Sequence, residues 1–186
     1  MAGGLEGDYY KGPLGSDLPA PIAQGVRLHR AIDAYTDSHP LVVQLRRDFP
    51  GHLRRYAGIL IDLSFDHYLS KHWHLYSDLP LEQFNAGIYR ALTSQEQALS
   101  AGSRRMLARM LEHDILGRYR DWETVPASAA RIGQRFRRGN PLTDTGADLD
   151  PVRDQLEQAF LGFYPQLQAF SKGHDNSATL RGENTA

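Results

Sequence analysis

The sequence predicts an all-α protein, a single compact helical bundle. Apolar residues recur at three- to five-residue steps along most of the 186-residue chain, as they do on one face of an α-helix. No segment shows the sustained apolar–polar alternation and β-branched enrichment of a strand. Prolines and glycines separate the apolar runs, which indicates helices joined by short turns.

The helices are expected in the following order. Helical spacing begins at Pro21, and His39-Pro40 ends that helix and starts the next, because proline suits the first turn of a helix. Residues 52–76 are apolar around most of a helical circumference and predict a central buried helix. Further helices are expected over residues 81–92, 101–113, 116–122 with a continuation over 127–136, and 150–171.

Three regions follow from this pattern. Residues 1–20 are rich in glycine and proline and are expected to form an N-terminal loop. Residues 21–172 are expected to form the helical domain that would carry any catalytic site. Residues 173–186 are polar and aperiodic, so a disordered tail is expected there.

Composition excludes several classes of protein. The net charge of −1 gives no overall field that would attract nucleic acid or an anionic membrane, so neither partner is expected. The chain has no cysteine, which excludes disulfide scaffolds, thiol nucleophiles and cysteine-bound metals. No segment approaches the roughly 18 apolar residues of a membrane span, and the first residues lack the features of a signal peptide. We therefore expect a cytoplasmic protein.

One helical face combines an imidazole with carboxylates. His29, Asp33 and Asp37 are spaced i, i+4, i+8 and share a face of the first predicted helix. Their nitrogen and oxygen donors suit Mn²⁺, Mg²⁺, Fe²⁺ or Zn²⁺. An isolated His-x-x-x-Asp is more often a simple surface pair, and Asp8, which follows Gly7, is more often a turn residue.

A second pair of carboxylates occurs in the most apolar stretch. Asp62 and Asp66 lie four residues apart, and burying an unpaired carboxylate costs several kcal/mol, so each requires a metal, an arginine or strong hydrogen bonds. A buried ion pair with Arg27, Arg30 or Arg55 explains them as well as a metal does. Two helices with such faces shift the balance towards a metal site.

Positive charge is concentrated in residues 40–56 and 104–138, although the whole chain is nearly neutral. Most charged runs are simply solvated, but two of them suggest an acidic partner that docks near the site. The candidate partner-binding residues are Arg46, Arg47, Arg54, Arg55, Arg131, Arg135, Arg137 and Arg138.

Four segments together resemble a known family. They are Gly7-Asp8-Tyr9-Tyr10-Lys11-Gly12, the run from Gly25 to Pro40, Arg54-Arg55-Tyr56-Ala57-Gly58 and the run from Asp62 to Trp73. In this order and spacing they resemble the bacterial acyl carrier protein phosphodiesterase family, also called acyl carrier protein hydrolase. Family members typically carry an apolar segment before the Gly-Asp motif, and this N-terminal helix is expected to be missing here.

The resemblance implies an HD-domain-like helical fold and a metal-dependent hydrolase, distantly related to the HD-domain phosphohydrolases. Such an enzyme cleaves the phosphodiester between phosphopantetheine and a serine of holo-acyl carrier protein, releasing phosphopantetheine and the apo protein. The implied cofactor is a divalent metal, Mn²⁺ first, with Mg²⁺ or Fe²⁺ as alternatives. Acyl carrier proteins are small and acidic, which would give the arginine-rich stretches a role.

On this basis the metal site is predicted to be centred on Asp8, His29, Asp33 and Asp66, with Asp37 and Asp62 as second choices. His67 or His39 is the candidate for proton transfer to the departing serine oxygen. Arg27 or Arg30 is the candidate for neutralising phosphate charge.

Two other functions remain open from the sequence. An HD-type hydrolase of a nucleotide or another small phosphoester would need no carrier protein. A non-catalytic helical module could instead bind acidic proteins through its arginines, with its aspartates in structural roles.

Overall fold

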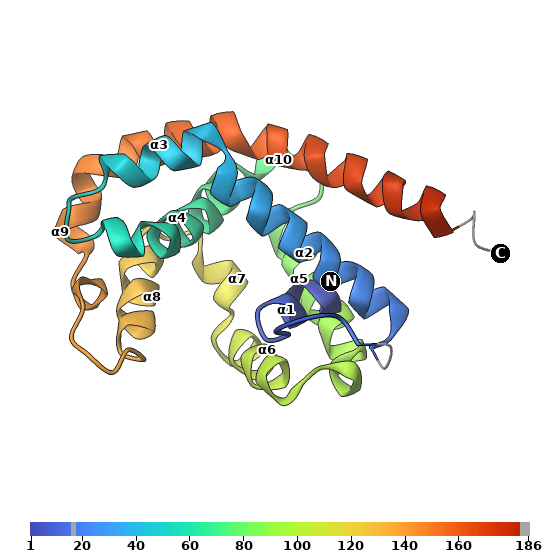
Figure 1. Ribbon diagram of the computed structural model, residues 1–186. Coiled ribbons are helices and arrows are strands. Elements are labelled where there is room, and N and C mark those ends of the chain that lie inside the picture. The colour runs from blue at the N-terminus through green and yellow to red at the C-terminus, as the bar shows by residue number, and fades with distance from the viewer. Residues whose placement is uncertain (16–17, 183–186) are drawn as a thin grey trace. The chain divides into compact units, whose positions relative to one another are not determined.

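The computed structural model describes residues 1–15 and 18–182, the segment 175–182 as backbone only, and it confirms the predicted all-α class (Figure 1). Within those residues the regular elements are α-helices and short 3₁₀-helices, without a strand. The α-helices are α1 (Ala2–Gly7), α2 (Ala20–Ser38), α3 (Pro40–Asp48), α4 (Ala57–Lys71), α5 (Leu81–Ser94), α6 (Ala101–His113), α7 (Ile115–Arg118), α8 (Thr124–Gly133), α9 (Gly146–Leu149) and α10 (Arg153–Gly182). The 3₁₀-helices are η1 (Arg54–Tyr56), η2 (Trp73–Leu75), η3 (Glu96–Ala98), η4 (Pro141–Thr143) and η5 (Asp150–Val152).

The chain forms two compact units. The first unit consists of Met1–Thr36, Glu82–Ile115 and Gln166–Ala186, and the second of Asp37–Leu81 and Leu116–Pro165. Helices α2 and α10 each contribute residues to both units. Among the described residues, no helix has the length and apolar character needed to cross a membrane.

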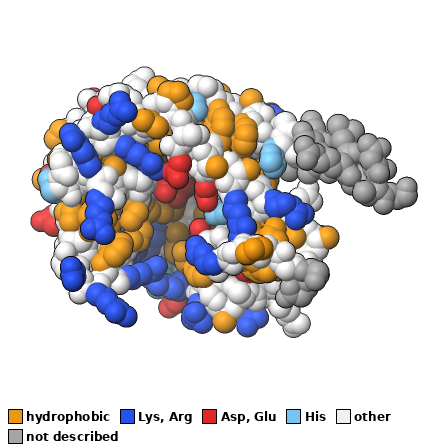
Figure 2. All heavy atoms as spheres, in the orientation of Figure 1, with side chains coloured by type: hydrophobic (Ala, Val, Ile, Leu, Met, Phe, Trp, Pro, Cys, Tyr) orange, Lys and Arg blue, Asp and Glu red, His pale blue; other side chains and the backbone are white. Residues whose placement is uncertain are grey.

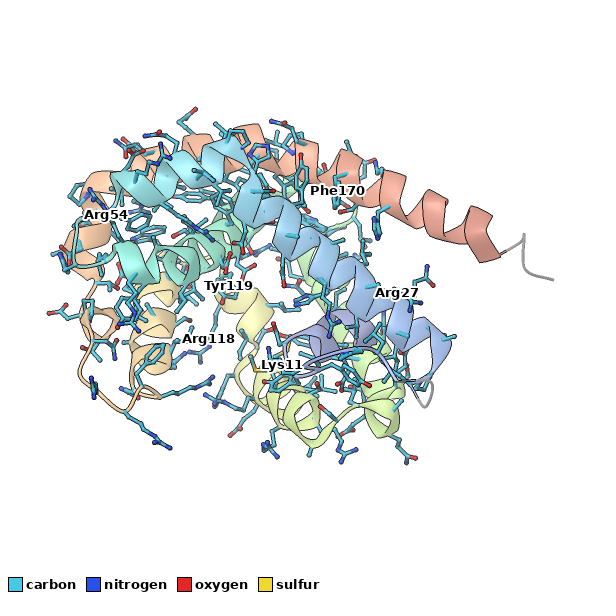
Figure 3. All side chains as sticks on the ribbon, viewed as in Figure 1. Lys11, Arg27, Arg54, Arg118, Tyr119 and Phe170 are labelled. Atoms are coloured by element: carbon cyan, nitrogen blue, oxygen red, sulfur yellow. The ribbon has the colours of Figure 1, made fainter. Side chains whose placement is uncertain are left out.

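The core of the first unit is aliphatic. Ala2 of α1 packs with Ile22 and Val26 of α2, and Leu92 of α5 and Leu107 of α6 belong to the same buried cluster. These residues come from the apolar faces of their helices, so burying those faces joins α1, α2, α5 and α6. A second contact ties α10 to α2, because the rings of Tyr35 and Phe170 stack with centroids 4.3 Å apart (Figure 3).

The core of the second unit is aromatic and is organised by α4. Tyr68 is fully buried, and its ring contacts Trp122 and Phe160. The Tyr68 hydroxyl donates a hydrogen bond of 2.8 Å to the carbonyl oxygen of Arg153, so the one polar atom of this ring has a partner. Helix α4 packs against α3 and α8, and the buried side chains of α10 belong to the same core.

The structure corrects the expected loop over residues 1–20. Residues 2–7 form α1, and α2 begins at Ala20. The glycines of this segment suggested a loop because glycine weakens an isolated helix. Here the glycines let α1 pack closely on α2, and this tertiary contact outweighs their poor helix propensity.

Two further boundaries differ from expectation. The helix predicted over residues 52–76 is α-helical only over Ala57–Lys71, with tighter 3₁₀ turns on either side. The predicted tail begins inside α10, which continues to Gly182, while residues 183–186 lie outside the described residues. Once a helix is formed, each added residue gains a backbone hydrogen bond, so polarity and one glycine do not suffice to end it.

Candidate active site

Close packing of α1 on α2 builds the site in the first unit. A Cβ atom on Gly3 would lie 2.6 Å from the Cα of Gly25, and a Cβ on Gly25 would lie 2.7 Å from the Cα of Gly3. Both distances are shorter than real Cβ contacts, so only glycine allows the two backbones to meet here. One turn further along each helix, this contact brings Gly7 opposite His29.

Gly7 leaves the space that the His29 ring occupies. A Cβ on Gly7 would lie 2.1 Å from Cδ2 of His29. Asp8, the C-cap of α1, follows directly, and this position sets its carboxylate beside the same ring. The Gly-Asp sequence therefore acts as a unit in which the glycine admits the imidazole and the aspartate pairs with it.

His29 lies between two carboxylates. Its Nε2 is 3.4 Å from Oδ1 of Asp8 and 3.3 Å from Oδ2 of Asp33, which is one turn further along α2. The hydrogen bond with Asp8 raises the pKa of His29 most; burial opposes it, the charge of Asp33 reinforces it, and the result lies above the ordinary value. Only 23% of the His29 side-chain surface is exposed, whereas both carboxylates are open to solvent.

The remainder of the Gly7–Gly12 motif is a scaffold. The guanidinium of Arg30 donates hydrogen bonds to the carbonyl oxygens of Tyr10 and Gly12, at 3.0 and 2.8 Å. Gly12 has a φ of 84°, a conformation that glycine adopts without strain. Arg30 therefore fastens the loop to α2, and phosphate neutralisation by this side chain stays a prediction. Lys11 extends from the same loop (Figure 3), and its charge acts against protonation of His29.

The C-terminal end of α1 and the residues after it also contact α6 and its N-cap. Glu6 is buried, and its carboxylate accepts a hydrogen bond from the backbone N–H of Ser100, the N-cap of α6. The ring of Tyr9 covers Gly102 so closely that a Cβ there would lie 2.4 Å from Cδ1 of the ring. Sequence analysis missed these contacts, because their partners are more than 90 residues apart and no local pattern marks them.

Asp66 lies in the second unit, on α4. Enclosure by protein, and then the charge of Asp62, raise the pKa of Asp66 to about 7, although a hydrogen bond from Tyr119 opposes this rise. Tyr119 lies just after α7 (Figure 3), and its hydroxyl is also hydrogen-bonded to Ser128 of α8. The carboxyl of Asp66 is therefore a weaker acid than that of an ordinary aspartate, although the residue as a whole is exposed.

The expected burial of Asp62 and Asp66 is wrong. Both are exposed, and the buried face of α4 instead carries residues such as Leu60, Ser64 and His67. A helix that is apolar around most of its circumference offers several faces for burial, and the periodicity did not distinguish among them. Ion pairs with Arg27, Arg30 or Arg55 were one expected means of offsetting the cost of burying these carboxylates. Because both aspartates are exposed, that cost does not arise.

His67 is a core residue. Only 3% of its surface is exposed, and its Nδ1 lies 2.9 Å from the carbonyl oxygen of Tyr119, which makes Nδ1 the protonated nitrogen. Burial lowers the pKa of His67, and within the described part of the chain its Nε2 is buried without a hydrogen-bond partner. We therefore assign His67 the structural task of fixing the backbone that carries Tyr119.

His39 and Asp37 also have structural contacts. His39 is the N-cap of α3: its Nδ1 accepts a hydrogen bond from the backbone N–H of Leu41 at 3.3 Å, and its ring packs edge-on against Phe163. Asp37 pairs with Arg46, with Oδ1 and Nη2 2.5 Å apart. The ion pair thus joins Asp37, a predicted metal ligand, to Arg46, a predicted partner-binding residue.

The chemistry of the donors in the first unit fits a divalent cation. An imidazole nitrogen flanked by two carboxylates is a mixed N/O set that suits borderline and hard metals. Over the part of the chain that the structure describes, no three His, Asp or Glu side chains are grouped closely enough to hold a metal ion. Asp66 and Asp62 belong to the other unit. The metal site thus stays a prediction that the donor types support.

The eight predicted partner-binding arginines all belong to the second unit. Seven of them are exposed, and only Arg46 is half-buried. Lys and Arg side chains are spread over the elements of this unit, with apolar side chains between them (Figure 2). Both arginine-rich stretches therefore contribute arginines to the second unit, while Arg104, Arg105 and Arg109 of the second stretch belong to the first unit.

The described fold is helical, and its first unit holds a histidine between two carboxylates. These two features make the protein a candidate hydrolase of the all-α class. A family model described as acyl carrier protein phosphodiesterase matches residues 1–167. The chain belongs to this acyl carrier protein phosphodiesterase family, which confirms the resemblance in its motifs.

Curated proteins give the same assignment. A protein from Klebsiella pneumoniae subsp. pneumoniae, named acyl carrier protein phosphodiesterase, is 33% identical over 178 residues, covering 92% of this chain and 90% of its own. Proteins of the same name from Salmonella dublin and Escherichia coli O6:H1 are each 31% identical, covering 91% and 90% of this chain and 88% and 87% of their own. No solved structure matches the chain.

Proposed function

We propose that this protein hydrolyses the phosphodiester that joins phosphopantetheine to the serine of holo-acyl carrier protein. Water adds to the phosphorus, the bond between phosphorus and the serine oxygen breaks, and that oxygen takes up a proton. The products are apo-acyl carrier protein and phosphopantetheine. Family membership supports the substrate, and the placement of His29 between Asp8 and Asp33 is the observation that supports the chemistry.

We further propose a divalent metal cofactor, Mn²⁺ first, with Mg²⁺ or Fe²⁺ as alternatives. His29, Asp8 and Asp33 would hold it, and Asp66 stays a predicted ligand. When bound, such an ion polarises phosphoryl oxygens and lowers the pKa of a bound water, to about 7 in favourable sites. The chain itself supplies orientation: the two carboxylates fix the His29 ring, and Gly7 keeps the space it needs.

The exposed arginines of the second unit are proposed to bind the acidic substrate protein. Arginine pairs with carboxylates through two parallel hydrogen bonds, which suits recognition of an acidic surface. The cysteine-free composition is in keeping with the cytoplasm, where we place the reaction.

The test is incubation of the protein with holo-acyl carrier protein and Mn²⁺, followed by intact mass analysis. We expect the carrier protein to lose the mass of phosphopantetheine. His29→Ala and Asp33→Asn should slow this release at least about 100-fold, as expected for groups that orient the reacting centre, and should retain helical circular dichroism. Asp48→Asn is the matched control, since this carboxylate is exposed and, among the described residues, accepts a hydrogen bond only from Gln44.

An unchanged carrier mass with the wild-type protein would refute the proposal. Hydrolysis of bis(4-nitrophenyl) phosphate without any action on the carrier protein would instead support a hydrolase of small phosphoesters. Full activity in His29→Ala would remove His29 from the mechanism.

A further inference from the structure

An exposed aromatic pair in the second unit links residues of the two arginine-rich stretches. The ring of Phe136 meets the ring of Tyr56 edge-on, with centroids 5.8 Å apart. Phe136 is 46% exposed, although it is a large apolar residue. The guanidinium of Arg55 lies over the Tyr56 ring, 5.9 Å from its centroid. Residues about 80 positions apart in the sequence thus share one surface.

Hydrogen bonds of Asn140 fix the conformation of the segment that carries Phe136, residues 133–142. The amide of Asn140 donates a hydrogen bond to the carbonyl oxygen of Gly133 at 2.9 Å, and its Oδ1 accepts one from the N–H of Leu142 at 3.1 Å. A Cβ on Gly133 would lie 2.8 Å from the same Asn140 oxygen, so glycine is needed for this close approach. Phe136 is therefore held outward by an ordered turn, and its exposure costs hydrophobic free energy that the isolated protein does not recover.

Positive charge without a local counter-charge surrounds the aromatic pair. Five arginines flank it in residues 54–56 and 134–139, segments that contain no acidic residue. All five are exposed, and within the described residues none forms an ion pair. We call this set the Phe136 surface: Tyr56, Phe136, Arg54, Arg55, Arg135, Arg137 and Arg138. Arg54 is labelled in Figure 3.

We propose that the Phe136 surface docks an acidic face of the substrate protein, with an apolar side chain of that face on Phe136 and its carboxylates on the arginines. Aromatic residues and arginine are the types that dominate the energy of protein interfaces, and an apolar centre with a charged rim is their common arrangement. A second copy of this chain is disfavoured, because five like charges would face five. The proposal rests on the proposed function, which supplies a protein substrate.

The test separates docking from catalysis. Phe136→Ala and the double variant Arg135→Glu/Arg138→Glu are compared with wild type for kcat and KM on holo-acyl carrier protein and for turnover of bis(4-nitrophenyl) phosphate. We expect KM for the carrier protein to rise about tenfold in Phe136→Ala and more in the double variant, with kcat and small-substrate turnover unchanged. The wild-type KM should also rise with salt, and less steeply in the double variant, because exposed charges are screened.

Matched controls exist in the first unit. Leu111→Ala removes an apolar side chain that is also 46% exposed, and Arg105→Glu/Arg109→Glu makes the same charge change at exposed positions of α6. Neither should change KM. Binding of fluorescently labelled carrier protein is measured in parallel, so the surface is tested whether or not hydrolysis is seen.

Several outcomes would overturn the docking proposal. An unchanged KM and binding constant in both Phe136 surface variants, with the wild type active, removes docking but leaves the proposed function. Equal losses on both substrates, with helical circular dichroism retained, would place these residues in catalysis and not in docking. Tighter binding of duplex DNA than of carrier protein, abolished by Arg135→Glu/Arg138→Glu, would reassign the surface to nucleic acid.

Discussion

At the scale of single residues, the site depends on three glycines as much as on its histidine and carboxylates. Gly7 has no side chain where the imidazole of His29 lies, and Gly3 and Gly25 have none where α1 and α2 meet. A methyl group at any of these positions would be too close to a ring or a backbone. The orientation of His29 towards Asp8 is thus a consequence of glycine placement.

The first prediction follows from this packing. Gly7→Ala should displace the His29 ring, because the new Cβ would lie 2.1 Å from Cδ2, and carrier protein hydrolysis should fall at least about tenfold. Gly4→Ala in the same helix is the control, since nothing lies within 4 Å of its Cβ. Alanine is the better helix former by about 1 kcal/mol, so Gly4→Ala should leave the melting temperature unchanged or raise it. Equal kcat/KM values for the two variants would contradict the packing argument.

The same scale shows what a sequence can predict about the site. The pair of His29 and Asp33 was predictable, because helix geometry alone makes residues four apart into neighbours. The partner of Asp66 was not, since Tyr119 follows it by more than 50 residues and no local pattern joins them. The burial of His67 was not predictable for a related reason, since no local pattern shows which face of α4 is buried; its role in proton transfer stays a prediction.

At the scale of elements, the order of the main helices was predictable and their buried faces were not. Prolines and N-cap residues mark helix starts locally, as His39-Pro40 does for α3. Helix α4 is apolar nearly all round, so its partners α3 and α8 decide which side is buried. Helix α1 was missed because tertiary packing stabilises a glycine-rich segment that has little helix propensity of its own.

A prediction at this scale concerns the contact between α4 and α10 in the second unit. Oε1 of Glu157 accepts hydrogen bonds from Nζ of Lys71 at 2.6 Å and from Nε2 of His72 at 2.5 Å. Burial acts to raise the pKa of Glu157, but these two partners outweigh it and hold that pKa below its ordinary value. Glu157→Gln should therefore lower the free energy of unfolding at pH 7 by about 1–2 kcal/mol.

The stabilisation by Glu157 should decrease as the pH falls. A carboxylate with a lowered folded-state pKa stabilises the protein above the unfolded-state pKa, which is 4.5, and this stabilisation is lost as the pH falls through the folded value. The difference between wild type and Glu157→Gln, measured by urea unfolding, should be full at pH 7 and shrink below pH 4.5. Glu96→Gln, at an exposed position of η3, should show no such difference. A gap that grew towards low pH would contradict this account.

At the scale of the whole molecule, the two units carry different candidate functional groups, although each unit is close to neutral. A net charge of −1 conceals eight candidate partner-binding arginines in the second unit and the His29–carboxylate group in the first. Seven of these arginines are exposed, and exposed charges stabilise a monomer little, so their grouping is better explained by a binding task than by folding. Catalytic chemistry and substrate recognition are therefore expected to respond to different substitutions.

The last prediction tests the metal through the stability of the protein. A ligand that binds only the folded state at 100 times its Kd adds about 2.7 kcal/mol, which for a chain of this size raises the melting temperature by roughly 5–10 °C. We expect Mn²⁺ to produce such a shift in the wild type, and EDTA to reverse it. His29→Ala and Asp33→Asn should remove the shift, because they delete donors of the predicted site, whereas Asp48→Asn should keep it.

Asp66→Asn tests the sequence-based prediction for the second unit: a normal Mn²⁺ shift in this variant would exclude Asp66 as a ligand. An identical melting temperature for wild type with Mn²⁺ and with EDTA would refute the metal proposal, even if the carrier protein were hydrolysed.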